Sequence, residues 1–137
     1  MPNEQWIMSA FKMTPSPEAS RVVMGLRAIA IVGLATIPIN YAILKRLIAM
    51  IETVRTGDPF VPANAQRLRT IAWALLALQL FGMVIWLIAE TVSSPAHPLD
   101  IDAGFSINGW LAVLLTFVLS SVFAKGTHMR EDLEGTV

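Results

Sequence analysis

The chain has 137 residues, of which 55% are hydrophobic and only 15% are charged, and its formal net charge is zero. A soluble domain of this size has too little interior to bury so much apolar surface, so the composition excludes an ordinary soluble domain. The balanced charge gives no attraction to nucleic acid, and the lack of cysteine excludes disulfides, thiolate nucleophiles and cysteine-ligated metals.

Three apolar runs follow one another along the chain, at 22–44, 71–89 and 105–124. Each is close to the roughly 20 residues with which a helix crosses a hydrocarbon layer of about 30 Å. Backbone groups inside lipid need internal hydrogen bonds, so these runs predict helices. The predicted fold is an all-α integral membrane protein with three transmembrane helices and short cytoplasmic helical extensions. The helices are expected at about 21–56, 65–93 and 105–125.

Lysine and arginine gather on one side of this arrangement. Residues 45–69 contain five of them and the C-terminal end contains Lys125 and Arg130, whereas 91–104 contains none. The positive-inside rule therefore places the 45–69 loop and the C-terminus in the cytoplasm, and the 91–104 loop on the outer side. Three regions result: a tail at 1–20 that is outward or interfacial, a membrane domain at 21–126, and a cytoplasmic tail at 127–137.

Local signals refine the cytoplasmic loop. Apolar residues at 47, 48, 51 and 54 continue a helical stripe past the membrane, and Gly57 is a natural end for that extension. Asn64 is expected to cap the start of the second helix, and Gly126 is expected to break or kink the third. The acidic tail either docks on the basic loop, or the loop contacts anionic lipid.

Several polar or small residues lie inside the predicted spans. Arg27 either pairs with Glu90 to gate a cleft or extends to the lipid headgroups. Gln79, near the midplane, is expected to hydrogen-bond between helices, with ligand contact as the alternative. Four small residues recur every fourth position on the third helix and predict close packing on another helix or on a second copy. They are Ala112, Thr116, Ser120 and Ala124.

No recognisable nucleophile–base pair, metal-ligand cluster or cofactor motif occurs in the sequence. We therefore expect no enzymatic activity, and no catalytic, metal or cofactor site.

Two motifs carry a resemblance to a known family. The first is Gly-Asp-Pro-Phe at 57–60, followed by Asn64 and Arg-Leu-Arg at 67–69; the second is the ending from Phe123 to the C-terminus. Together they resemble the YoaS-like small bacterial membrane proteins (DUF2975). The resemblance implies a multi-pass protein of a bacterial inner membrane. Members usually have four membrane helices, whereas this sequence shows three, and the family's first helix would precede Trp6. Either the gene starts further upstream, or this chain is a shortened member. Members are often encoded beside a small helix-turn-helix regulator, which implies a membrane protein that controls or sequesters a transcription factor.

The leading hypothesis is a regulatory or sensory membrane protein that binds a cytoplasmic partner, such as that regulator, and does not itself bind nucleic acid. Phe60, Asn64, Arg67 and Arg69 are the candidate contact residues. Each also has a local explanation: a loop plug, a helix cap and two membrane-surface anchors. The alternatives are an accessory or assembly subunit docked through the small residues of the third helix, self-association, and, least favoured, a small oligomeric transporter. No carboxylate lies at the midplane, which disfavours coupled transport.

Overall fold

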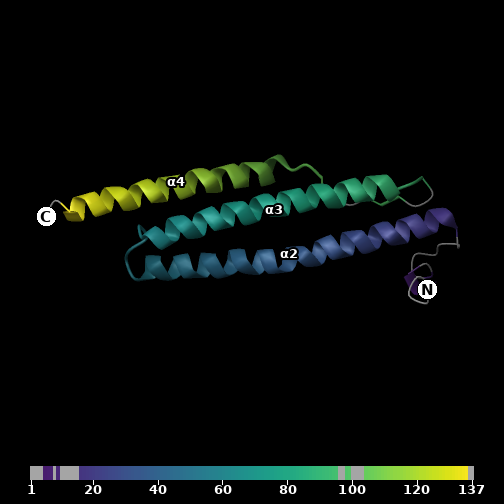
Figure 1. Ribbon diagram of the computed structural model, residues 1–137, viewed down its shortest axis with the longest axis horizontal. Coiled ribbons are helices and arrows are strands. Elements are labelled where there is room, and N and C mark those ends of the chain that lie inside the picture. The colour runs from purple at the N-terminus through teal and green to yellow at the C-terminus, as the bar shows by residue number, and fades with distance from the viewer. Residues whose placement is uncertain (1–4, 8, 10–15, 96–97, 100–103, 136–137) are drawn as a thin grey trace. The chain divides into compact units, whose positions relative to one another are not determined.

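The computed structural model describes residues 5–7, 9, 16–95, 98–99 and 104–135. Three long helices follow one another in Figure 1: α2 (Pro17–Arg55), α3 (Pro62–Val92) and α4 (Ile107–Gly135). At a rise of 1.5 Å per residue they are about 58, 46 and 44 Å long, so each exceeds the roughly 30 Å of a hydrocarbon layer. All three are also apolar enough to cross a membrane. The predicted all-α membrane fold with three spanning, extended helices is confirmed.

Short polar signals start the helices. The Ser16 side chain accepts a hydrogen bond from the backbone N–H of Ala19 at 3.1 Å, directly before Pro17 opens α2. The Ser106 side chain accepts one from Gly109 at 3.2 Å and caps α4 in the same way. A proline opens α3, because a first-turn residue needs no N–H donor. The helix starts are therefore encoded locally.

The chain packs as two compact units. The first combines Met1–Ala35 with Phe81–Phe105, and the second combines Thr36–Leu80 with Ser106–Val137. In the first unit Ala19, Val22 and Val23 of α2 are almost wholly buried. A Cβ atom added to Gly25 would lie 2.7 Å from a methyl carbon of Val92, so glycine is what allows α2 and α3 to approach each other here.

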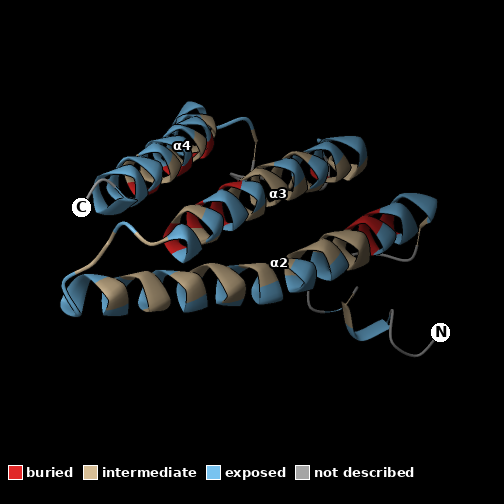
Figure 2. Cartoon of the chain, turned by 60° about the vertical axis from the view of Figure 1, so that its left-hand side comes forward, coloured by how far each residue is buried: buried red, intermediate tan, exposed pale blue. Residues whose placement is uncertain are grey.

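The second unit has α3 between the other two helices (Figures 1 and 2). Its buried α3 residues lie on one helical face, and its buried α4 residues recur every seventh position. A seven-residue spacing returns a side chain to nearly the same face of a helix, so these residues form one seam. The buried residues are Asn64, Leu68, Ile71 and Ala72 on α3, and Val113, Ser120 and Thr127 on α4.

The expected break at Gly126 is wrong, because α4 continues through this residue to Gly135. The reason is a tertiary contact. The Phe60 ring lies directly on Gly126: a Cβ atom added to Gly126 would be 2.7 Å from the Cδ1 atom of Phe60. Packing of this ring offsets the roughly 1 kcal/mol by which glycine disfavours a helix. The segment expected to be a separate tail is thus, as far as residue 135, the end of α4.

Candidate functional site

The turn between α2 and α3 is built around Gly57. Its φ angle is +93°, a left-handed conformation that glycine adopts without strain. Its N–H bonds the carbonyl of Val54 at 3.0 Å, and the N–H of Asp58 bonds the carbonyl of Thr53 at 3.0 Å. This pair of bonds is the Schellman arrangement, in which the residues after the helix satisfy its last carbonyls. Gly57 therefore ends the α2 extension as the sequence predicted.

Asn64 holds this turn together from inside α3. Its side-chain amide donates to the Thr53 hydroxyl at 2.7 Å and to the Pro59 carbonyl at 2.8 Å. Its side-chain oxygen accepts a bond from Arg67 at 2.8 Å. The residue is 0% exposed. The expectation that Asn64 caps α3 is wrong, because the helix starts two residues earlier and the amide bonds the preceding helix and turn instead.

Two further contacts join the turn to the end of α4. The Arg130 guanidinium forms an ion pair with the Asp58 carboxylate. The Phe60 and Phe123 rings lie 5.5 Å apart between centroids, at an angle of 35°. We call the residues that make these contacts the turn cluster: Thr53, Asp58, Phe60, Asn64, Phe123, Gly126 and Arg130.

The turn cluster has a topological consequence. Because Asp58 and Arg130 touch, the α2–α3 turn and the end of α4 lie on the same side of the bilayer. Docking of the acidic tail on the basic loop was one of the two alternatives. The tail does contact the loop, but with the opposite signs: the base, Arg130, belongs to the tail and the acid, Asp58, to the loop. Acids at 131, 132 and 134 are exposed beside this contact. The overall charge of two segments does not determine which of their residues meet.

The structure separates the four candidate partner-binding residues. Asn64 is buried, and Arg67 is half-buried and bonded to it. Phe60 is 42% exposed, so one side of its ring packs on α4 while the other remains accessible. Arg69 is exposed and lies outside the cluster. Phe60 and Arg69 thus present the most side-chain surface to a partner, Arg67 presents less, and Asn64 presents none.

Five members of the turn cluster were not among the candidate site residues, although four of these five belong to the two family motifs. Asp58 belongs to the first motif, and Phe123, Gly126 and Arg130 belong to the second. The structure shows that the two motifs pack on each other. The sequence did contain a signal for this contact, because both motifs are predicted to lie on the same side of the membrane. No sequence signal pointed to Thr53, because its role depends on a hydrogen bond with Asn64, eleven residues later.

Within the membrane-spanning parts, Gln79 lies against Gly109 of α4. A Cβ atom added to Gly109 would overlap the Gln79 amide, so glycine makes room for this side chain. Gln79 thus packs between helices, although its expected hydrogen bond across them stays a prediction. In the first unit Arg27 is half-buried and Glu90 is exposed, and their pairing also stays a prediction.

The four small residues of α4 do not share one environment. Ser120 is buried, Thr116 and Ala124 are half-buried, and Ala112 is exposed. Four-residue steps advance about 40° each around a helix of 3.6 residues per turn, so such a stripe winds away from a straight neighbour. The Thr116 hydroxyl bonds the Ala112 carbonyl of its own helix at 2.7 Å. Of the four, Ser120 alone is buried by the rest of this chain.

In the described parts of the chain, no three histidine, aspartate or glutamate side chains gather as a metal site would require. The fold and the turn cluster define a small multi-pass membrane protein whose two motifs meet at one end of the helices. The chain belongs to DUF2975, a family described as proteins of unknown function, whose model matches residues 5–137. Searches of curated proteins and of solved structures find no match.

Proposed function

We propose that this protein is a non-enzymatic regulatory membrane protein that binds a cytoplasmic protein partner at the end formed by the turn cluster. The observation that carries the proposal is an apolar stripe on the α2 extension, which leads into this cluster. Leu47 is 40% exposed, Ile48 is 67% exposed, and Ile51 and Val54 are each 59% exposed. We call these four residues the α2 stripe.

The position of the α2 stripe supports a protein partner. It follows Lys45 and Arg46, which mark the membrane surface in the sequence, so it extends beyond the hydrocarbon. Contiguous apolar surface in water favours burial against another protein. Thr53 lies between Ile51 and Val54, the last two stripe residues, and its hydroxyl accepts a hydrogen bond from Asn64. This bond holds the adjacent turn in place before any partner binds.

The nature of the partner rests on the family resemblance. A small helix-turn-helix regulator, encoded beside many family members, would be held at the membrane by this surface. The accessory-subunit alternative used the small residues of α4 as its docking face. It gains less support, because Ser120 is already buried inside this chain.

Affinity purification from the native host in mild detergent tests the proposal, with the co-purifying proteins identified. The test variant is Ile48→Ser with Ile51→Ser. The control is Met129→Ser with Leu133→Ser, whose side chains are 66% and 70% exposed on the last turns of α4. Arg67 is not substituted, because it bonds the buried Asn64.

A small DNA-binding protein that is lost with the test variant and kept with the control supports regulation. Recovery of other membrane subunits would favour the accessory role. Recovery of this chain alone would reject a separate partner and favour self-association.

A further inference from the structure

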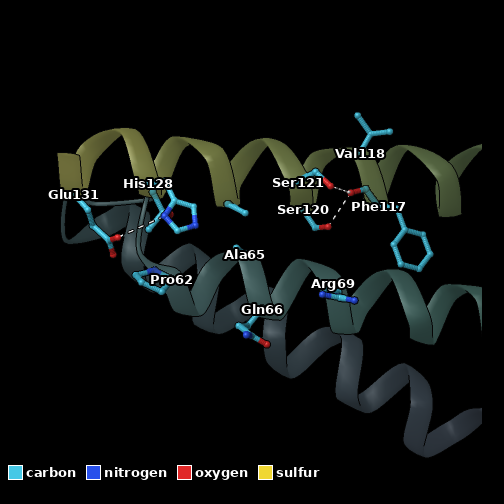
Figure 3. Close-up of a pocket in the computed structure, with 12 residues that line it drawn as sticks. Pro62, Ala65, Gln66, Arg69, Phe117, Val118, Ser120, Ser121, His128 and Glu131 are labelled. Atoms are coloured by element: carbon cyan, nitrogen blue, oxygen red, sulfur yellow. Dashed lines mark hydrogen bonds and ion pairs between the residues drawn. The ribbon is translucent and has the colours of Figure 1, made fainter. Parts of the chain in front are cut away.

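A groove runs between the start of α3 and the second half of α4, entirely within the second unit (Figure 3). Its volume is about 610 Å³, inside the range of roughly 300–1,000 Å³ that is typical of small-molecule sites. Gln66 and Arg69 line it from α3, and Phe117, Val118, Ser121 and His128 are among the residues that line it from α4. None of these residues belongs to the turn cluster or the α2 stripe.

The two ends of the groove differ in polarity. Phe117 and Val118 belong to the apolar run of α4 that spans the membrane, whereas His128 lies beyond that run. On the opposite wall Arg69 comes two residues before Ile71, where the apolar run of α3 begins. The groove therefore crosses from the hydrocarbon into the headgroup layer. This geometry suits an amphiphile that has one apolar end and one polar end.

Arg69 supplies the charge that such a ligand would meet. Two other arginines of the second unit are occupied: Arg67 bonds Asn64, and Arg130 pairs with Asp58 and Glu134. For Arg69 the described part of the chain provides no ion pair, and the residue is exposed toward the groove. A guanidinium matches phosphate oxygens with several donors at once.

The acidic lining residue does not cancel this charge. Glu131 lies near the end of the groove away from Arg69 (Figure 3), and its carboxylate is 3.8 Å from the His128 ring. The Ser120 and Ser121 hydroxyls opposite Arg69 both donate to the Phe117 carbonyl, at 2.8 and 3.2 Å. These hydroxyls carry no formal charge, so the part of the groove beside Arg69 is positively charged.

We propose that this groove binds one anionic phospholipid of the surrounding bilayer. Its phosphate lies on Arg69 and its headgroup reaches towards Gln66 and His128. One acyl chain follows Phe117 and Val118 into the hydrocarbon. The site would combine the charge attraction of a basic pocket between membrane helices with burial of part of an acyl chain.

Lipid-dependent thermal stabilisation of the purified full chain in mild detergent tests the proposal. Phosphatidylglycerol should raise the unfolding midpoint at concentrations at least tenfold lower than phosphatidylcholine, a difference of about 1.4 kcal/mol in binding. Arg69→Gln should remove this preference. Ser121→Phe, which fills the groove and leaves its charge intact, should remove the stabilisation. Arg55→Gln is the matched control, because Arg55 pairs with Glu52 outside the groove.

The readout is the shift caused by lipid, so a variant with a lower starting midpoint is still informative. Equal stabilisation of all four proteins would overturn the site, since it would reflect unspecific lipid contact. Equal stabilisation by phosphatidylcholine would overturn the anionic preference. If soluble glycerol phosphate matched the lipid at equal concentration, the ligand would be a free anion and the lipid proposal would be wrong.

Discussion

Replacing Asn64 by alanine should destabilise the protein more than any exposed polar substitution. The change removes the bonds to Thr53, Pro59 and Arg67. Each hydrogen bond contributes about 0.5–1.5 kcal/mol net, which places the sum between roughly 1.5 and 4.5 kcal/mol. Pro59 and Arg67 are only half-buried and can bond water instead, so we expect about 2–3 kcal/mol. For a chain of this size that is a fall of roughly 10 °C in the unfolding midpoint.

The assay is thermal unfolding in mild detergent, followed by the fluorescence of the four tryptophans. Asn40→Ala is the matched control, because Asn40 is exposed and bonds only the Thr36 carbonyl of its own helix, at 2.9 Å. Asn64→Asp should be at least as damaging as alanine, since it removes both donors and sets a carboxylate against a carbonyl oxygen. A midpoint for Asn64→Ala within about 2 °C of the Asn40→Ala control would refute the reasoning.

Three other predictions concern the same end of the molecule. Gly126→Ala should lower the unfolding midpoint despite the better helix propensity of alanine, because the Cβ atom meets an aromatic ring; Gly135→Ala, with open space around it, should not. A double-mutant cycle on Asp58→Asn and Arg130→Gln should give a coupling below about 1 kcal/mol, because both side chains are partly exposed; a larger value would mean that the pair is effectively desolvated. A thiol introduced by Thr56→Cys, in a chain that has no native cysteine, should react only with reagents that reach the cytoplasm, and labelling from outside would reverse the proposed orientation.

Helix number and approximate extent could be read from the sequence because they depend on local properties. Apolar runs of membrane length predicted α2, α3 and α4, and Gly57 predicted where the α2 extension ends. The errors arose where a distant contact decides the outcome. From sequence alone Gly126 suggests a helix break, and only the packing of the Phe60 ring on it shows why the helix continues. Asn64 likewise suggests a helix cap from sequence alone, whereas its side chain bonds Thr53 of α2.

The candidate site was predictable to a similar degree. The sequence drew attention to the α2–α3 loop and to the C-terminal ending, because their residues are distinctive, and these two segments meet in the turn cluster. It did not reveal that the two segments touch, since Asp58 and Arg130 are more than seventy positions apart and several other charges could have paired. The groove beside Arg69 was equally hidden, because its walls come from two helices whose register only the fold specifies.

The seven-residue seam of α4 restricts how the length of this helix can change during evolution. Val113, Ser120 and Thr127 face inward because each lies two turns after the last. A single residue inserted between Ser120 and Thr127 would rotate everything beyond it by about 100°, which would carry Arg130 away from Asp58. An insertion of seven residues would keep the facing but shift the end of the helix by about 10 Å. Homologues of this chain should therefore share the spacing between these positions even where their lipid-facing residues have diverged.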